Sequence, residues 1–203
     1  VAPVAQFELG TKTRGSLGAA RYALSATYFH STTKEFDYDP TRNIQRDGPY
    51  LRELGYKADG VEFESGFSIG NFALNANVVY SDESFTKNTA SATYLGKTPA
   101  GSTKWRYTLS PRYTLGDSVI GATVRGVGKM YLNDDNSASV AGHYIVSAFV
   151  NHDFGNGIVG SLNVNNLFNK LYPSSTANQI SGNFYNAGVE TGRTVSATLK
   201  YKF

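Results

Sequence analysis

The chain has 203 residues, no cysteine and a formal net charge of +3. Without cysteine it has no disulfide framework, no cysteine-ligated zinc and no thiol nucleophile. The small positive excess contains no run of Lys or Arg, which excludes a basic nucleic-acid-binding arm. The mean hydropathy is −0.31, and no window of about 18 apolar residues marks a transmembrane helix.

Apolar and polar residues alternate along most of the chain, which predicts about nine β-strands. In chain order the predicted strands cover residues 4–13, 19–32, 55–69, 72–81, 103–115, 119–130, 143–154, 158–167 and 192–203. The fourth is the most regular, with Phe72, Leu74 and Ala76 alternating with Asn75 and Asn77. In the fifth, Pro111 cannot donate a ladder hydrogen bond, so we expect a bulge there.

The last predicted strand has one apolar and one polar side. Val195, Ala197, Leu199, Tyr201 and Phe203 share one side, and Thr194, Ser196, Thr198, Lys200 and Lys202 share the other. Successive strand residues point to opposite faces, and about 9–11 tilted residues cross a bilayer. This segment is typical of a membrane-spanning strand with lipid on one side and a polar lumen on the other.

The predicted connections fall into two length classes. Short ones lie near residues 14–18, 70–71, 116–118 and 155–157, and long ones near 34–54, 82–102, 131–142 and 170–190. Short turns at one end and long loops at the other are typical of an outer-membrane barrel. The predicted fold is therefore all-β, a transmembrane antiparallel up-and-down β-barrel. A soluble β-sandwich is the alternative, but its strands average about 5–6 residues and these are longer.

Aromatic residues are expected in two bands that match the two interfaces of such a barrel. The turn-side band contains Phe72, Tyr113, Phe154, Tyr201 and Phe203, with Leu115, and the loop-side band contains Tyr28, Tyr80, Trp105, Tyr107 and Tyr144. A base-stacking surface would also be aromatic, but it would need a basic groove, which the sequence lacks.

The C-terminal region carries family motifs. Asn166, Leu167, Phe168, Lys170 and Tyr172 lie in a segment similar to the NLFDKxY signature of TonB-dependent outer-membrane receptors, with Asn169 in place of Asp. Further family positions follow at Tyr185, Gly188, Gly192, Arg193, Tyr201 and Phe203. These motifs cover about the last forty residues. Beyond them the predicted strands agree with the family in pattern only.

The resemblance implies a barrel of about 22 strands, filled by an N-terminal plug domain, in the outer membrane of a Gram-negative bacterium. It implies energised uptake of a ferric siderophore, cobalamin, haem or a saccharide, with the TonB complex as partner. This chain would be the C-terminal part of the barrel domain, over residues 1–203, without plug or TonB box. It starts at Val1 without Met, so we expect a processed product or a part of a longer protein.

Other partners and functions follow from the same interpretation. The expected partners are outer-membrane lipid, the rest of the same receptor and a small-molecule ligand, and not nucleic acid. If the first strand did not span, about eight would remain, enough for a small self-contained barrel with a structural or adhesive role. A soluble carbohydrate-binding β domain is the third hypothesis.

Charged and aromatic residues are the candidate sites. Arg106, Arg112, Arg125 and Lys129 are predicted to point into the lumen, as are Glu8, Glu62 and Glu64. There they would hold a plug by ion pairs or steer an anionic ligand. Tyr38, Tyr50, Tyr94, Tyr172 and Tyr185 are the candidate ligand contacts in the loops.

No catalytic, metal or cofactor site is predicted. His143 and His152 are nine positions apart in one strand, about 30 Å when extended, and His30 has no evident partner. The run 134–136 lacks the ligand spacing of a calcium loop, and 126–129 lacks the spacing of a phosphate loop. No G-x-S-x-G elbow occurs, so we expect a protein that is not an enzyme.

Overall fold

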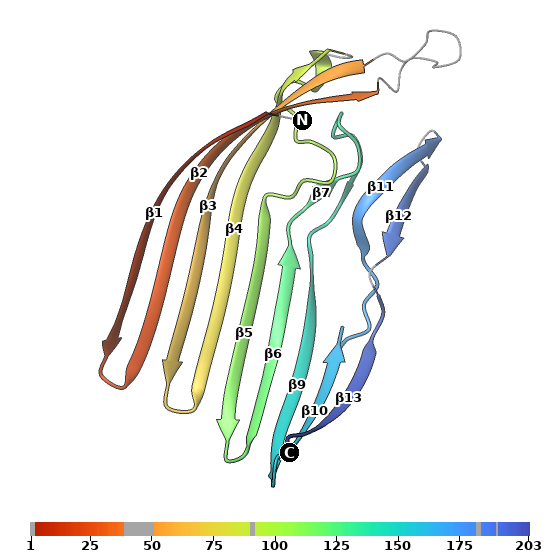
Figure 1. The fold of residues 1–203 in the computed structure, drawn as a ribbon. Helices are drawn as coiled ribbons and strands as arrows, with labels where there is room; N and C mark the ends of the chain where they lie inside the picture. Colours follow the sequence, from red (N-terminus) through yellow and green to blue (C-terminus); the bar gives the residue numbers. More distant parts are fainter. Residues whose placement is uncertain (1–2, 39–50, 90–91, 182–183, 190) are drawn as a thin grey trace.

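The computed structural model describes residues 3–38, 51–89, 92–181, 184–189 and 191–203. Nine antiparallel strands form one sheet in the order β1-β2-β3-β4-β5-β6-β9-β10-β13 (Figure 1). Their bounds are Val4–Leu17, Ala20–Tyr38, Leu51–Ile69, Phe72–Asn88, Trp105–Leu115, Ser118–Val127, His143–Gly155, Ile158–Asn165 and Thr194–Tyr201. The predicted all-β, up-and-down architecture is confirmed. The sheet is open, with β1 and β13 at its two edges.

The connections of this sheet are sorted as predicted. The four hairpin turns lie at the lower end in Figure 1, beside the C-terminus, and the long connections lie at the upper end. The long connections contain short elements that the periodicity did not predict: η1 (Ala92–Tyr94), β7 (Met130–Tyr131), β8 (Ser139–Val140), β11 (Pro173–Ser181) and β12 (Phe184–Val189). η1, β7 and β8 have only two or three residues, too few to show an alternation, and the nine residues of β11 have no regular alternation of apolar and polar residues.

The turn at residues 70–71 is as predicted, whereas the other three turns have two residues each and are shorter than predicted. At the β9–β10 turn both Asn156 and Gly157 have positive φ, 52° and 79°, the geometry of the tight hairpin turn that matches strand twist. The prediction of a connection at 14–18 was wrong, because Arg14 still pairs with Ala23 and β1 ends only at Leu17. The residues that continue the extended pairing there are Arg14, Gly15, Ser16 and Leu17, and none of them forbids the β conformation.

The bulge predicted at Pro111 was also wrong. Leu74 pairs with Pro111 in continuous register, and the β5–β6 ladder has the same register at Leu109 and at Arg112. The ladder to β6 has no pair at Pro111 itself. The missing N–H therefore interrupts one edge of β5 without inserting a residue.

Strand register sorts the side chains onto two faces. We call polar face the one that carries the row Lys12, Ser25, Glu64, Asn77, Thr108 and Arg125. We call apolar face the one that carries the row Ala26, Phe63, Val78 and Tyr107. Every strand contributes alternate residues to each face, as period-two geometry requires.

The apolar face is not covered by any described part of the chain. Leu162 is 48% exposed, Leu199 72% and Phe63 39%, whereas the buried apolar side chains of the described residues are only Leu54, Phe85 and Met130. An apolar face that is exposed along the sheet requires a partner to cover it. Over the described residues, helices long and apolar enough to cross a membrane are absent.

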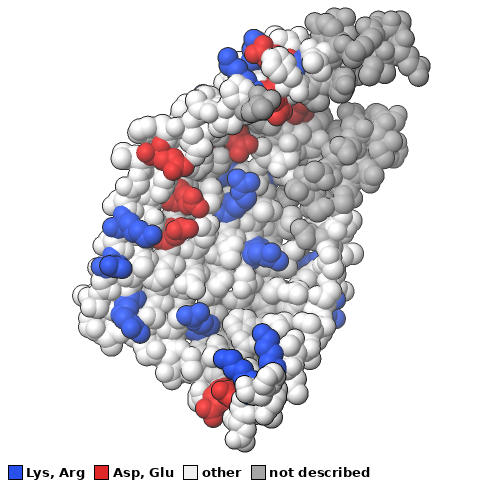
Figure 2. All heavy atoms as spheres, in the orientation of Figure 1, with Lys and Arg blue, Asp and Glu red and all other residues white. Residues whose placement is uncertain are grey.

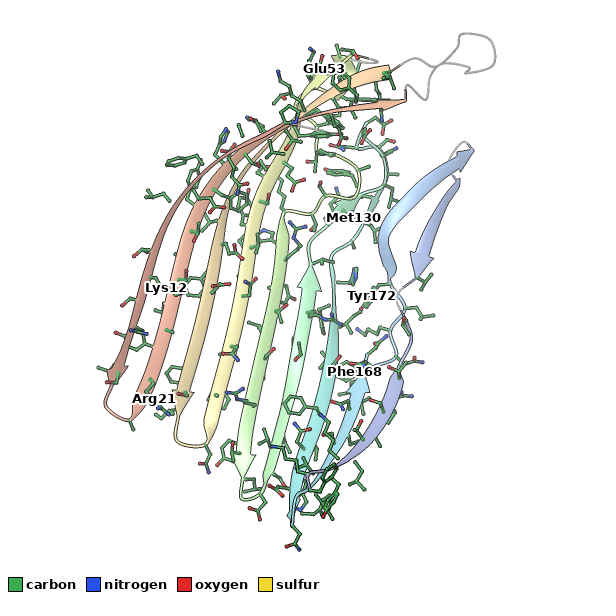
Figure 3. The ribbon with its side chains drawn as sticks, viewed as in Figure 1. Lys12, Arg21, Glu53, Met130, Phe168 and Tyr172 are labelled. Carbon is green, nitrogen blue, oxygen red and sulfur yellow. The ribbon has the colours of Figure 1, made fainter. Side chains whose placement is uncertain are left out.

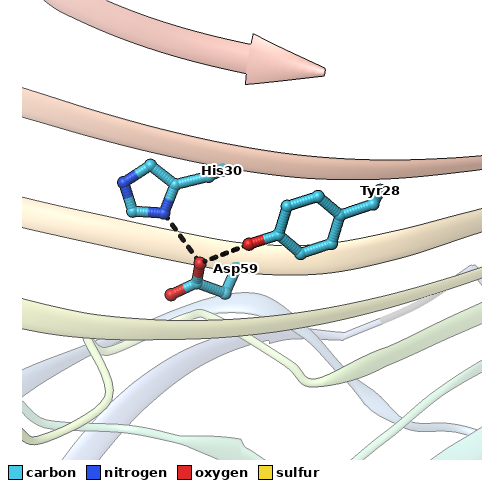
Figure 4. A network of polar contacts seen from close by, with 3 residues as sticks. All are labelled: Tyr28, His30 and Asp59. Carbon is cyan, nitrogen blue, oxygen red and sulfur yellow. Dashed lines mark hydrogen bonds and ion pairs between the residues drawn. The ribbon is translucent and has the colours of Figure 1, made fainter. Parts of the chain in front are cut away.

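On the apolar face, the last apolar row before the loop end consists mainly of aromatic residues, and we call it the aromatic row. Tyr28, Val61, Tyr80 and Trp105 are successive partners across four strands. The next row outward on the same face is charged, with His30, Asp59 and Asp82. His30 Nδ1 lies 2.7 Å and the Tyr28 hydroxyl 3.1 Å from Asp59 Oδ1, the three side chains drawn in Figure 4. The change from apolar to ionic side chains between adjacent rows is the signature of a membrane interface.

Candidate functional site

The charged residues of the polar face are unevenly distributed along its height: most acidic ones lie toward the loop end, whereas basic ones occur along the whole face. Lys12 and Arg21, labelled in Figure 3, lie on the face that Figure 2 displays. In Figure 2 acidic side chains gather on its upper part and basic ones below and across it. Register places Glu8, Glu62 and Glu64 toward the loops from the row of Arg21 and Arg112. The predicted residues Arg106, Arg112 and Arg125 also lie on this face.

A depression of about 570 Å³ lies on the polar face near the hairpin turns. We call it the basic cradle, because three arginines line it: Arg14, Arg21 and Arg112. Its other polar-face lining residues are small or polar: Ser16, Ala23, Gly66, Ser68, Ala73 and Asn75. Its lining contains no carboxylate. Such a site suits an anionic group that approaches close to the sheet.

A second cavity, of about 370 Å³, lies at the loop end of the same face. We call it the vestibule pocket, and its lining includes Glu35, Tyr56, Glu83 and Ser102. The Tyr56 hydroxyl donates to Glu35 Oε1 at 2.7 Å, and the Ser102 hydroxyl donates to Glu83 Oε2 at 2.5 Å. Each hydroxyl orients a carboxylate, whose remaining lone pairs can accept hydrogen bonds from a ligand.

The connection between β4 and β5 folds back onto β4 beside this pocket. The N–H of Gly96 donates to the carbonyl of Phe85 at 2.9 Å. The N–H of Phe85 donates to the carbonyl of Lys97 at 3.0 Å. The Tyr94 ring lies 6.4 Å from the Phe85 ring, and Tyr56 lies 5.1 Å from Phe85 on another side. The predicted vestibule residue Tyr94 therefore packs against Phe85 at the base of this connection and is not among the residues that line the pocket.

Residues 134–136 clasp that connection from the β7–β8 turn. Asn136 accepts from the N–H of Thr98 at 3.0 Å and donates to its carbonyl at 2.7 Å. Asp134 accepts from the N–H of Ala100 at 3.0 Å, and Lys97 Nζ donates to the carbonyl of Asp135 at 2.7 Å. This run, which lacks the ligand spacing of a calcium loop, joins the β7–β8 turn to the β4–β5 connection.

Asp135 and Lys104, at the loop end, have pKa values shifted toward their charged forms. The Ser137 backbone N–H and hydroxyl hydrogen-bond Asp135 and hold its pKa below the ordinary value. The hydrogen bond from Lys104 Nζ to Asp82, at 2.7 Å, raises the pKa of Lys104. Each shift favours the charged form of its group.

The other predicted ligand contacts divide into two groups. Lys129 lies between β6 and β7 with its ammonium 4.5 Å from the Tyr131 ring centre, and Tyr172 stacks on His143 at 4.2 Å. The structure does not describe the side chains of Tyr38, on β2, and Tyr185, on β12, and Tyr50 lies wholly outside the described residues. Their roles stay predictions.

The C-terminal motif forms a structural clamp around Asn166. Asn166 has a φ of 50° and is 4% exposed. Its amide donates to the carbonyls of Lys170 and Thr191, at 2.7 and 3.1 Å, and its Oδ1 accepts from the N–H of Lys170 at 3.0 Å. One side chain thus joins the end of β10 to the approach to β13.

Asn169 and Arg193 complete the clamp. Asn169 Oδ1 accepts from the N–H of Arg193 at 2.8 Å, and Arg193 Nη1 donates to the carbonyl of Leu167 at 3.4 Å. A Cβ on Gly192 would lie 3.1 Å from Asn169 Oδ1, which leaves little room for a larger residue there. Asn169 therefore keeps a side-chain oxygen as hydrogen-bond acceptor at the position where the family signature has Asp. Phe168 and Leu171 remain exposed.

The three histidines have separate partners. His30 pairs with Asp59, His143 stacks on Tyr172, and His152 Nδ1 lies 2.8 Å from the Ser118 hydroxyl. Within the described residues, no three His, Asp, Glu or Cys side chains converge as metal ligands would.

Sequence reasoning missed the residues that shape the two cavities. Arg14, Arg21, Glu35, Tyr56 and Glu83 were not singled out, although the alternation places each of them on the polar face. Their place in the alternation was a signal from which the polar face could have been predicted for each of them. Which of them meet across strands depends on register, and the pattern within one strand does not state it.

Comparison with known proteins gives two kinds of match. Residues 4–167 match the family model described as TonB dependent receptor-like, beta-barrel. This region covers the body of the sheet, whereas the resemblance noted in the sequence lies mainly after it. A search of curated protein sequences found no match.

Three solved structures illustrate the similarity of fold. The ferric preacinetobactin receptor BauA of Acinetobacter baumannii has a TM-score of 0.75 at 24% identity, over 98% of this chain and 29% of its own. The siderophore receptor PiuA of Acinetobacter baumannii has a TM-score of 0.76 at 22% identity, over 98% and 28%. The ferripyoverdine receptor of the outer membrane of Pseudomonas aeruginosa has a TM-score of 0.70 at 16% identity, over 100% and 27%.

The chain thus spans less than a third of the length of the solved receptors that it matches. The family model matches most of the sheet, and the nine-stranded order, the two faces and the sorted connections agree with it. This chain therefore belongs to the family of TonB-dependent receptors and forms strands of their β-barrel.

Proposed function

We propose that the chain is the C-terminal part of the β-barrel of an outer-membrane receptor that imports a scarce nutrient, with a ferric siderophore as the favoured ligand. The observation that carries this proposal is the pairing of an uncovered apolar face with a charged polar face along the whole sheet. In a bilayer the first meets hydrocarbon and the second lines an aqueous lumen. The similar solved receptors BauA and PiuA are a ferric preacinetobactin receptor and a siderophore receptor, which supports the choice of ligand.

The open edges support a larger assembly. All fourteen residues of β1 pair with β2, so β1 is a full strand and not a peripheral segment, which disfavours a closed barrel of about eight strands. The outer edges of β1 and β13 have no partner within the described sheet. Unpaired backbone groups cost several kcal/mol each in hydrocarbon. Further strands of the same receptor would pair with both edges, and a plug domain would occupy the lumen and contact the TonB complex.

The vestibule pocket is the proposed first contact for the ligand. It opens at the loop end, where a molecule from outside the cell would enter. Glu35 and Glu83 offer acceptors for amine or hydroxyl groups, and Tyr56 adds an aromatic ring. We infer binding and transport without chemical change of the ligand.

Iron-dependent growth and uptake test this proposal. The gene for the full receptor would be deleted, and uptake of a panel of ⁵⁵Fe-labelled siderophores measured in iron-starved cells, with and without a protonophore. We expect energy-dependent uptake of at least one chelate to be lost and to return with the gene. Uptake of labelled cobalamin is the control for other nutrients. If every chelate enters at the wild-type rate, siderophore import is refuted.

A further inference from the structure

We propose that Asp134 and Asn136, which do not line the vestibule pocket, are positioning residues for the ligand that binds there. They belong to the turn between β7 and β8 and hold the part of the β4–β5 connection that forms one wall of the pocket. The inference rests on the proposed function, because it assumes that the ligand first binds in this pocket. It assigns the residues that keep the pocket in a shape ready for binding.

One wall of the vestibule pocket is a four-residue turn. Pro99 and Ser102, both on the β4–β5 connection, are among the residues that line the pocket. The N–H of Ser102 donates to the carbonyl of Pro99 at 3.2 Å, and Gly101 between them has a φ of 83°. A turn with positive φ at its third residue favours Gly there, because Gly has no Cβ to clash. We call residues 99–102 the wall turn.

The central residues of the wall turn are bound from the side of β7 and β8. The N–H of Ala100 donates to Asp134 Oδ1 at 3.0 Å, and the N–H of Gly101 donates to the carbonyl of Tyr131 at 2.9 Å. The turn's own hydrogen bond joins its first and last residues and leaves these two N–H groups free. The wall turn therefore depends on a distant segment of the chain for both of them.

Asn136 fixes the residue that precedes the wall turn. Its Oδ1 accepts from the N–H of Thr98 at 3.0 Å, and its Nδ2 donates to the carbonyl of Thr98 at 2.7 Å. One side chain thus pairs with both backbone groups of Thr98, as a residue of a neighbouring strand would. Asn136 has a φ of 59°, which Asn adopts more readily than most residues. The start of the wall turn is therefore held in place by a single side chain.

The other side of the wall turn contacts a carboxylate of the pocket. The Ser102 hydroxyl donates to Glu83 Oε2 at 2.5 Å. Glu83 is in one row with Ala58 and Ser31, which also line the pocket. A displaced wall turn would remove the donor that orients Glu83 and would move Pro99 away from the pocket. The place of the wall turn therefore controls the shape of the pocket and the direction of one of its acceptors.

The hydrogen bonds of Asp134 and Asn136 order the wall before the ligand arrives. A loop that is free in the unbound receptor must be ordered on binding, and the lost conformational entropy weakens the affinity. Asp134 and Asn136 together make three hydrogen bonds to the backbone of residues 98 and 100. Their removal should therefore weaken ligand binding without changing a group that the ligand contacts.

Uptake kinetics of the full-length receptor provide the test. Cells without other receptors for iron chelates would express wild type or D134A/N136A, and import of three ⁵⁵Fe-labelled chelates would be measured, a hydroxamate, a catecholate and a citrate. For each chelate that wild type imports, D134A/N136A should raise the half-saturating concentration by roughly tenfold and keep the maximal rate within about twofold. D134N keeps an oxygen that accepts from Ala100 and should stay close to wild type. Heat-modifiable gel mobility shows that each variant is folded.

Two comparisons separate positioning from general stability. S137A removes the hydroxyl that accepts from Asn133 Nδ2 at 2.7 Å, a contact within the β7–β8 turn, and should keep the wild-type half-saturating concentration. S102A breaks the link to Glu83, so N136A should raise the half-saturating concentration much less in S102A than in wild type. A residue that only stabilised the fold would have the same effect in both backgrounds.

The outcomes keep this inference apart from the proposed function. If wild type imports a chelate and D134A/N136A imports it with the same half-saturating concentration, the positioning role is refuted and the receptor proposal stands. A rise in S137A as large as that in D134A/N136A, or an equal effect of N136A with and without S102A, also refutes the positioning role. If wild type imports none of the three chelates, siderophore import itself is refuted, and the positioning of its ligand with it.

Discussion

Asn166 shows how a single side chain can decide the path of a long connection. Its backbone lies in the left-handed region, and its side chain makes three hydrogen bonds to backbone groups on both sides of β11 and β12. Asn tolerates this conformation better than most residues because its short amide bonds locally. The family motif at this position is therefore explained by structure and does not require a ligand.

Replacing Asn166 should destabilise the receptor measurably. N166A loses the three hydrogen bonds and strains the backbone, so we expect a loss of about 3 kcal/mol in unfolding free energy. N166G loses the same bonds without the strain and should cost about 1 kcal/mol less. The urea dependence of heat-modifiable mobility, with full receptor in detergent, measures both.

The neighbouring residue supplies the control. Asn165 lies on the exposed polar face with one weak contact, 3.4 Å from its Nδ2 to Thr194 Oγ1, so N165A should change stability by less than about 0.5 kcal/mol. A loss in N165A as large as that in N166A would show that the clamp has no special role.

At the scale of elements, register converts alternation into rows with a physical meaning. The aromatic row from Tyr28 to Trp105 ends the apolar face, and the charged row with His30, Asp59 and Asp82 begins directly beyond it. From Tyr28 in the aromatic row to Ala20, where β2 begins after the hairpin turn, β2 contributes nine residues. At a tilt of about 40° they cover roughly 23 Å, close to the apolar height of a barrel.

Lysine substitutions on one strand test this membrane boundary. Ala76 lies on the apolar face near its middle, and Ser84 lies on the same side of β4 beyond the aromatic row. A76K should cost about 2–4 kcal/mol and S84K no more than about 1 kcal/mol. Urea-dependent folding of the receptor into lipid vesicles measures both, and equal costs would contradict the boundary.

The clasp between two loops should respond to acid. The pKa of Asp135 is lowered in the folded loop, so its contribution to order is complete above the unfolded pKa of about 3.9 and is lost as pH falls through the lower folded value. A spin label at Ala138, introduced as cysteine, should therefore remain immobile down to about pH 4 and become mobile below it.

Asp135→Asn is the control for this acid response. The amide cannot titrate, so the mobility of the label should no longer depend on pH between about 2 and 5. If the label in the Asn variant still becomes mobile in the same pH range, another group controls the loop.

At the scale of the whole molecule, the sheet depends on partners that it does not contain. Its apolar side chains are exposed, and neither edge strand has an outer neighbour among the described strands. Lipid can cover the apolar face, but it cannot satisfy the backbone groups of an open edge. We therefore expect the unit that folds to be larger than these residues.

Residues 1–203 alone should fail to form a stable barrel. Refolded from urea into detergent micelles, they should run on gels at the same position with and without boiling, whereas the full receptor should show a heat-modifiable band. A heat-modifiable monomer from this chain alone would instead favour the small self-contained barrel.

Much of the fold could be predicted because alternation is a local property. The polar and apolar sides of β4 or β13 follow from side-chain geometry within one strand, whatever lies beside it. Strand order followed from the sorted short and long connections. The candidates Arg106, Arg112 and Arg125 were placed on the correct face for the same reason.

The sequence by itself thus determined the two faces, the sorted connections and the family motif, because each depends on residues close together in the chain. Only the tertiary structure decided that Arg14 and Arg21 share a depression with Arg112, that Tyr56 meets Glu35, and that Asn136 holds Thr98. These contacts depend on register between distant strands and on loop paths. A shift of one residue would send every such side chain to the other face.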